Sequence, residues 1–385
     1  MPSTLLLFLL KVTTPEGLRL QSSNLRFCLS EWVGKYKKLI NLIPSAYLHI
    51  PLICISLFQF SCGDKEKSEP QQIEISAGNM VLVCNEGNFR WGNAAAGLLN
   101  LSNQKWTEDA FKAINNRNLG DVLQSATIWN NAWWLVVNNS AKIEVVSTAG
   151  FSVQKTITGF VSPRFLLPIN ETKAYVSDIY AKKIWILNSS SNVPVGSIPF
   201  AGWSEEMVLS GNLAWVVCPG KAKVFLINTS NDQLEDSVSL PGKSTSIAVS
   251  KSGKMWAGFD SSATQNSGLA IINPNSLQVE KLLYSNERNY YPTHFQPSAT
   301  KDSLFFLQNG VFMLRENEHA FPTTNLAQGL TGNWYGMGFD QKRREIYLSD
   351  AKDFQQKSRI VRINPEANTK QELAGGIISS RFYFW

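Results

Sequence analysis

The stretch "AYVSDIYAKKIWILN", residues 174–188, contains the pattern from which the fold can be predicted. Two runs of mostly apolar residues flank a short polar segment, and the second run ends at Asn188. Apolar runs that are bounded by turn residues predict β-strands, and two such runs close together predict an antiparallel hairpin. The rest of the chain shows whether this hairpin occurs once or is one copy of a repeat.

Similar stretches, in which an apolar run meets a polar turn, occur along the whole chain from residue 81 onward. The residues that end these runs are Asn85, Asn138, Asp178, Cys218, Phe259, Gln308 and Asp350. Their successive separations are 53, 40, 40, 41, 49 and 42 residues. A strand–turn–strand unit that returns at about 40 residues is the mark of a repeat architecture.

The spacing also fits the size of one blade of a β-propeller, which has four short strands in about 40 residues. Six units are expected, at 119–160, 161–202, 203–242, 243–289, 290–332 and 333–376. The segment 80–118 lacks a leading strand, and the tail 376–385 is one strand with nothing after it. Joined, they would make a seventh unit. We therefore predict an all-β, seven-bladed β-propeller closed by pairing the C-terminal strand with the first blade, with six or eight blades as alternatives.

The composition agrees with an all-β chain. Hydrophobic residues make up 44% and aromatic residues 11% of the sequence, and helical periodicity is nearly absent. One short helix is expected within "TEDAFKAIN", residues 107–115, in the connection that follows the first unit. This insertion accounts for the long first separation.

Residues 1–61 have the layout of an export leader. A basic patch at Lys35, Lys37 and Lys38 precedes an apolar run that ends near Phe60. Cys62 then follows a small residue, as in a bacterial lipobox, which predicts lipidation of Cys62. An uncleaved membrane anchor is the alternative. Residues 1–32 fit no signal layout and are interpreted as translated from an upstream start.

The expected mature chain therefore consists of a lipidated flexible linker, 62–78, and a propeller, 79–385. Charged side chains just after Cys62 resemble export signals of Bacteroidota surface lipoproteins, so we expect a cell-surface lipoprotein of the outer membrane. The leader holds 6 of 36 basic and 2 of 30 acidic residues, which leaves 30 minus 28, or about +2. This small charge gives no support to nucleic-acid binding. Membrane contact is expected through the lipid anchor only.

The sequence gives little sign of catalysis. Only His294 and His319 remain after the leader, and no metal, phosphate-loop or nucleophile motif is present. His294 is expected to pack or hydrogen-bond at an inner strand. Glu205 and Glu206 are neighbours that would point to opposite faces of a strand, which makes them a poor acid–base pair. We expect no enzymatic activity, no cofactor, no metal and no disulfide framework, with Cys84 and Cys218 as packing residues.

The repeat geometry predicts a binding face instead, because the hairpin loops and the loops between units lie on the same side of a propeller. That side would carry amides, carboxylates, arginines and large aromatics, which suit a bulky polar ligand. The candidate ligand-binding residues are Asn85, Glu86, Asn88, Asp121, Asn138, Asn139, Arg164, Asp178, Tyr180, Trp203, Asp260, Tyr291, Gln308, Asn309, Trp334, Tyr335, Asp350 and Arg381. The alternative for each aromatic is packing between blades.

Several segments resemble a known group of proteins. With "VLVCNEGNF", "LGDVLQSATI", "VVNNSAKIEVV" and "NWYGMGFD", the chain resembles the YVTN-repeat (YncE-like) propellers, and more closely their Bacteroidota surface lipoprotein branch of the DUF5074 type. Some members of this branch are similar to the cobalamin-binding BtuG-like proteins. The resemblance covers about residues 80–385, but "CPG" at 218–220 departs from the polar hairpin tips that are usual there.

The resemblance implies a non-enzymatic role. The lipoprotein would capture a small-molecule ligand, a corrinoid such as cobalamin, and pass it to a TonB-dependent outer-membrane receptor. Two alternatives stay open from the residues. One is a surface adhesion or protein-interaction propeller that uses its rim, and the other is a propeller enzyme, either a lyase or a quinoprotein-like oxidoreductase.

Overall fold

The computed structural model describes residues 73–385. The predicted leader, Cys62 and the linker up to residue 72 lie outside the described residues. Within 73–385 the regular secondary structure is almost entirely β-strand, as predicted, and no helix there is long and apolar enough to cross a bilayer.

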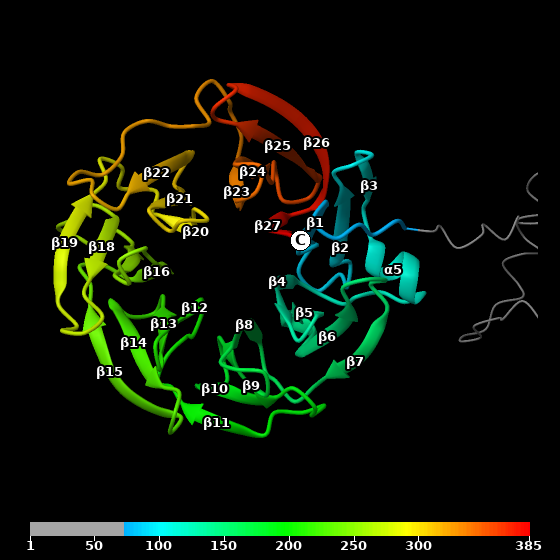
Figure 1. Ribbon diagram of the computed structural model, residues 1–385, viewed down its shortest axis with the longest axis horizontal. Coiled ribbons are helices and arrows are strands. Elements are labelled where there is room, and N and C mark those ends of the chain that lie inside the picture. The colour runs from blue at the N-terminus through cyan, green and yellow to red at the C-terminus, as the bar shows by residue number, and fades with distance from the viewer. Residues whose placement is uncertain (1–72) are drawn as a thin grey trace, which may run out of the picture. The chain divides into compact units, whose positions relative to one another are not determined.

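Five sheets are separate units of three or four antiparallel strands that follow one another along the chain (Figure 1). The first has β4 (Leu123–Trp129), β5 (Ala132–Val137), β6 (Lys142–Ser147) and β7 (Val153–Ile157); the second has β8 (Pro163–Pro168), β9 (Lys173–Asp178), β10 (Lys183–Asn188) and β11 (Gly196–Pro199). The third has β12 (Met207–Ser210), β13 (Leu213–Cys218), β14 (Lys223–Asn228) and β15 (Gln233–Ser239). The fourth has β16 (Ser244–Val249), β17 (Met255–Phe259), β18 (Gly268–Ile272) and β19 (Val279–Tyr284), and the fifth has β20 (Thr293–Pro297), β21 (Ser303–Leu307) and β22 (Val311–Arg315). The hairpin predicted at residues 174–188 is therefore β9–β10, and it is one copy of a repeat.

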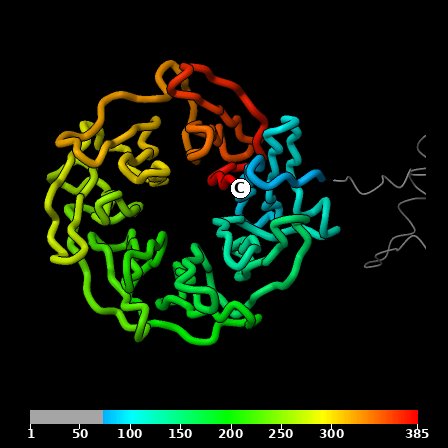
Figure 2. Tube along the Cα trace, in the orientation of Figure 1, coloured from blue at the N-terminus to red at the C-terminus, as the bar shows by residue number. Residues whose placement is uncertain are grey.

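The two ends of the described chain meet in a sixth, eight-stranded sheet of order β26-β25-β24-β23-β27-β1-β2-β3. Its strands are β1 (Met80–Asn85), β2 (Ala95–Asn100), β3 (Lys105–Thr107), β23 (Trp334–Asp340), β24 (Glu345–Asp350), β25 (Lys357–Asn364), β26 (Thr369–Ile377) and β27 (Ser379–Phe384). Figure 2 shows the red C-terminal strand beside the blue start of the described chain.

The prediction of seven separate blades, closed by a tail that completes the first, is therefore wrong. Five blades are separate, and the expected first and last units form one sheet. The antiparallel pairing of β27 with β1 is present, with Val83 opposite Phe382, but β27 also bridges to β23 at Met337 and Arg381. The tail is thus an interior strand of the eight-stranded sheet and not the edge of a seventh blade.

Two glycines in β23 explain the merger. A Cβ atom at Gly336 would lie 2.5 Å from the Ser380 carbonyl oxygen, and one at Gly338 would lie 2.5 Å from the Phe382 Cβ. Glycine in a strand often marks a place where another backbone approaches closely. Without side chains at these positions, β27 comes near enough to β23 for a hydrogen-bonded bridge.

The predicted short helix is present as α5 (Ala110–Asn115), where Phe111 is fully buried. Asp109 caps it by accepting a hydrogen bond from the Lys112 N–H, and Asn116 ends it in the left-handed conformation. A side-chain oxygen before the first turn and a left-handed residue after the last are the usual helix boundaries.

The core lies between the sheets. Trp134 and Val136 of β5 and Val145 of β6 pack with Leu166 and Val176 of the next sheet. Full burial of such a side chain contributes about 1.5–3 kcal/mol. Cys84 and Cys218 are buried without a disulfide, as expected. Outer strands such as β15 are mostly exposed, so the first strand of each unit faces the centre of the ring (Figure 1).

Candidate functional site

Two adjoining cavities occupy the centre of one face of the propeller. Their volumes are about 380 Å³ and 370 Å³. They share five lining residues, which are Arg164, Tyr291, Thr293, His294 and Arg381. Four of these five belong to strands β8, β20 and β27, which face the centre of the ring. The innermost strands therefore build a common floor for both cavities.

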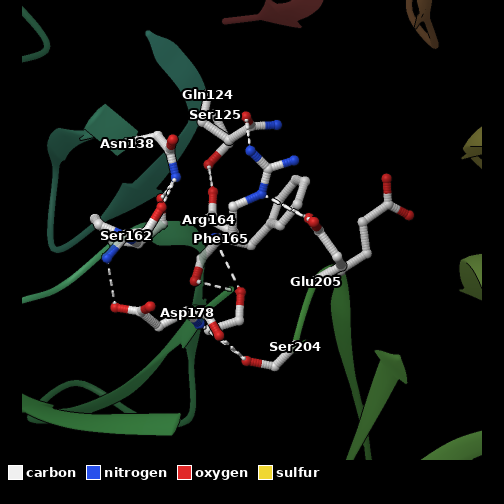
Figure 3. Close-up of polar contacts among 12 residues, drawn as sticks. Gln124, Ser125, Asn138, Ser162, Arg164, Phe165, Asp178, Ser204 and Glu205 are labelled. Carbon is white, nitrogen blue, oxygen red and sulfur yellow. Dashed lines mark hydrogen bonds and ion pairs between the residues drawn. The ribbon is translucent and has the colours of Figure 1, made fainter. Parts of the chain in front are cut away.

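Arg164 on β8 is fixed by two acceptors, which Figure 3 shows. Its Nε donates to both carboxylate oxygens of Glu205, at 3.0 and 2.8 Å, and its Nη1 donates to the Gln124 Oε1. Burial raises the pKa of Glu205, although the Arg164 charge opposes this shift. The guanidinium plane is therefore held in one orientation before any ligand arrives.

Arg381 on β27 forms the second fixed cation. Its Nη2 donates to the Glu206 Oε1 at 2.8 Å, and its guanidinium lies 4.6 Å from the centre of the Phe165 ring. Burial by itself would lower the pKa of Arg381, but the charge and hydrogen bond of Glu206 together with the charges of Tyr383 and Glu205 outweigh it, and the pKa is raised. Ser246 donates to the other oxygen of Glu206. Arg381 is thus firmly charged and immobile.

Glu86 and Tyr335 stand together in the wall of the first cavity. The Tyr335 hydroxyl lies 3.2 and 3.1 Å from the two carboxylate oxygens of Glu86. Burial raises the pKa of Glu86, against the lowering effect of Ser380, Arg164 and Tyr335. Phe354 meets the Tyr335 ring edge to face at 5.3 Å. An acid with a raised pKa in a cavity is a common feature of binding sites.

His294, which was expected to pack or hydrogen-bond at an inner strand, lies on β20 and lines both cavities. Its backbone φ is 54°, where the register of β20 with β21 shifts, and its Nδ1 lies 3.1 Å from the Thr293 Oγ1. Burial, followed by the charge of Arg381, lowers its pKa to about 3. His294 is therefore neutral at physiological pH and adds no charge to the floor.

The predicted binding residues fall into three groups. Ten line the two cavities: Glu86, Arg164, Trp203, Asp260, Tyr291, Gln308, Asn309, Trp334, Tyr335 and Arg381. Six are buried, namely Asn85, Asn88, Asp121, Asn138, Asp178 and Asp350, and two are exposed outside the cavities, namely Asn139 and Tyr180. The hairpin-end residues divide between buried structural positions and the cavity lining, and strands together with the loops between units supply the rest of the lining.

Asp178 shows why the buried group is structural. Its two carboxylate oxygens accept from the backbone N–H groups of Val161, Ser162, Tyr180 and Ala181 and from the Trp185 indole. Asn138 similarly donates to the Ser162 Oγ at 2.8 Å (Figure 3). A buried polar group must find such partners, and here the partners are the turns that it braces.

Several lining residues were not predicted, among them Gln124, Glu205, Glu206, Thr293 and His294. The premise that Glu205 and Glu206 lie in a strand is wrong, because residues 201–206 form no strand, and both residues line the second cavity. The sequence signal that could have placed Glu205 and Glu206 in the lining was their position just before a strand and close to Trp203. Gln124 lies within a strand whose sequence does not show which residues face the centre.

The acidic residues that sit at hairpin ends do not come together. Asp178 ends β9 and Asp350 ends β24, and Asp260 directly follows β17, so the three lie at different sheets. Among residues 73–385 there is no group of three or more histidine, cysteine or acidic side chains with the spacing of a metal site.

Solved structures share this architecture at low sequence identity. A quinonprotein alcohol dehydrogenase-like protein from Bacteroides thetaiotaomicron is 13% identical, with a TM-score of 0.64, and the match covers 80% of this chain and 78% of that chain. The β-propeller domain of Cps50 (Swd1) from Myceliophteria thermophila is 11% identical, with a TM-score of 0.54, covering 78% and 98%. These matches show the fold alone. No curated protein matches the sequence.

A family model matches residues 79–384, which is nearly all of the described chain. That span includes every cavity-lining residue named above. The chain is therefore a β-propeller that belongs to the family described as a domain of unknown function, DUF5074.

Proposed function

We propose that this protein is a non-enzymatic lipoprotein of the outer-membrane surface that captures a ligand in the two central cavities. The lipid on Cys62 would be its only membrane contact. The ligand that we propose is a corrinoid such as cobalamin, which the protein would pass to a TonB-dependent receptor. The YncE-like and BtuG-like resemblance of the sequence suggests this identity.

The observation that carries the proposal is the junction of the two cavities over a common floor. Together they offer room for a ligand much larger than a metabolite fragment. Trp203 and Tyr291, which are 49% and 43% exposed, stand at the rim with Trp334. Exposed aromatic faces above fixed polar groups are suited to a flat, bulky and polar molecule.

The arrangement of the floor favours binding over catalysis. Glu205 and Glu206 are each tied to an arginine, and Glu86 accepts from Tyr335. A general acid or base must be free to exchange a proton with a substrate. Side chains that are locked in ion pairs instead act as fixed donors and acceptors, which supports the non-enzymatic proposal.

The test measures corrinoid binding to a soluble chain that starts at residue 68. Calorimetry and the quenching of tryptophan fluorescence give the affinity. Eleven of the twelve tryptophans remain in this chain, since only Trp32 precedes it. Tyr291→Ala should weaken binding by about 2- to 10-fold, the usual worth of an aromatic contact. Tyr180→Ala is the matched control, because Tyr180 is exposed on the same predicted face but lines neither cavity.

Unchanged affinity in Tyr291→Ala would place the ligand elsewhere. Failure of the wild-type chain to bind corrinoid at high micromolar concentration would reject the corrinoid proposal. The fold and the cavities would then have to serve another ligand.

A second candidate function, binding of a protein partner, is favoured by the loop 86–93. It exposes 58% of Phe89 and 71% of Trp91, and Arg90 lies over the Phe89 ring at 5.2 Å. The loop is braced, because Asn88 donates to the Phe354 carbonyl at 2.8 Å. Rigid aromatic and arginine side chains are common at the centre of protein interfaces. Loss of capture by the TonB-dependent receptor in Trp91→Ala, with corrinoid affinity unchanged, would assign the loop to the partner.

A further inference from the structure

The two arginines of the floor keep donors that no described residue uses. Arg164 uses Nε and Nη1, so that among the contacts of residues 73–385 its Nη2 remains without an acceptor. Arg381 uses Nη2, which leaves its Nε and Nη1 without one in the same part of the chain. Both guanidiniums line both cavities. The floor therefore offers N–H donors to a ligand.

The two arginines of the floor carry no spare positive charge to accompany these donors. Lys243 also lines the second cavity, but Asp260 lines it too, so this pair adds no net charge. Arg164 is balanced by Glu205 and Arg381 by Glu206, each at 2.8 Å. His294 is neutral. Glu86 is a third acid, and it lies close enough to both arginines for their charges to oppose the rise in its pKa that burial causes. The charge of the floor is thus negative or zero, depending on whether Glu86 carries a proton.

Glu86 adds an acceptor beside the donors. It accepts from the Tyr335 hydroxyl, and a carboxylate has about four acceptor positions, so that others remain available. A ligand group on this floor therefore meets arginine N–H donors and a carboxylate acceptor within one cavity.

The geometry points to an uncharged carboxamide as the chemical group that the floor recognises in its ligand. This inference rests on the proposed binding function and specifies the ligand class of the same site. The amide oxygen accepts from a free N–H of Arg164 or Arg381, and the amide NH₂ donates to Glu86. Every polar atom of the group finds a partner, and the charge balance of the floor does not change.

Charged groups fit this floor less well. A carboxylate or phosphate could accept from the arginines, but it would bring a further negative charge beside Glu86, Glu205 and Glu206, and like charges brought together in a desolvated site are costly. An ammonium group could approach Glu86, but it has no acceptor for the arginine donors and lies beside two cations. A neutral group with both a donor and an acceptor avoids both costs.

The experiment compares benzamide and benzoate, which share the aromatic ring and differ only in amide and carboxylate. Ligand-observed NMR at neutral pH and millimolar concentration gives their affinities for the full chain. We expect benzamide to bind about tenfold more tightly than benzoate. Glu205→Gln removes the charge that balances Arg164, so this variant should gain benzoate affinity and reverse or abolish the preference.

Two further variants complete the design. Glu206→Gln should act on Arg381 in the same direction, which keeps the test valid if Glu205→Gln does not fold. Glu280→Gln is the matched control, because it removes the same charge from the exposed Lys254–Glu280 pair away from the cavities. It should leave the preference for benzamide unchanged.

Equal or tighter binding of benzoate to the wild-type chain would overturn the inference, as would absence of binding of both probes. These outcomes do not depend on corrinoid binding. If the chain prefers benzamide but binds no corrinoid, the amide inference stands and the corrinoid proposal is rejected. If the chain binds corrinoid but does not prefer benzamide, the corrinoid proposal stands and the amide inference is rejected.

Discussion

Among single residues, the partner of a buried charge can lie far away in the sequence. Glu144 on β6 is fully buried and accepts from both terminal nitrogens of Arg117, at 2.9 and 2.8 Å, from Lys142 and from Thr156. Burial alone would raise the pKa of Glu144, but these hydrogen bonds outweigh it and the pKa is lowered. Nothing in "KIEVVS" indicates that Arg117 is the partner.

Replacing Glu144 with glutamine should lower the free energy of unfolding at neutral pH by about 1.5–3 kcal/mol, the worth of hydrogen bonds to a charged group. Because the folded pKa lies below the ordinary 4.5, this contribution is present above about pH 4.5 and is lost as the pH falls through the folded value. The difference between wild type and variant should therefore narrow in acid, as measured by urea unfolding. Glu280→Gln, on an exposed pair, is the control, and a difference that stays constant with pH would contradict the explanation.

At the scale of elements, β27 is the strand on which the ends of the ring depend. Phe382 is 3% exposed, lies opposite Val83 and contacts Tyr347 with ring centres 5.9 Å apart. Its Cβ also approaches Gly338 closely. One side chain of the tail therefore touches strands from both ends of the described chain.

Phe382→Ala should destabilise the protein by about 3–5 kcal/mol, as expected when a large core aromatic is truncated. Leu234→Ala on the exposed outer strand β15 is the control and should change stability by no more than about 0.5 kcal/mol. Chemical unfolding of the two variants gives the comparison. A cost for Phe382→Ala as small as that of the control would mean that the tail is not essential to the eight-stranded sheet.

At the scale of the whole molecule, the ring is uneven, because one of its units has only three strands. The sheet β20–β22 has no fourth strand within the described residues, and its edge is covered by coil. The Leu326 N–H donates to the Val311 carbonyl at 2.8 Å, and the Asn325 side chain accepts from the Val311 N–H. The corresponding third strands β10 and β14 are covered by β11 and β15 instead.

Hydrogen exchange should therefore be faster in β22 than in β10 or β14. Regions with fewer backbone hydrogen bonds between strands open at a lower free energy. Exchange measured by mass spectrometry on peptides that cover 311–315, 183–188 and 223–228 tests this. Equal protection in the three strands would show that the coil 316–333 seals the edge as well as a strand does.

The repeating hairpins, their spacing of about 40 residues and the short helix near residue 110 could all be predicted from the sequence. These are local features, set by apolar runs of strand length, by turn residues and by helix caps, so they can be read without knowing the partners of each strand. Ten of the cavity-lining residues followed as well, because the hairpin loops and the loops between units lie on the same side of a propeller.

The remaining features depend on contacts between residues far apart in the sequence. The eight-stranded sheet depends on the approach of β27 to Gly336 and Gly338. No local sequence pattern predicts contact between residues that are about 45 positions apart. The ion pairs of the floor depend in the same way on where the coil 201–206 turns. A buried polar group is stable only where it finds hydrogen-bond partners. The positions of those partners in the fold therefore determine whether a polar residue braces a turn, as Asp178 does, or lines a cavity, as Glu86 does.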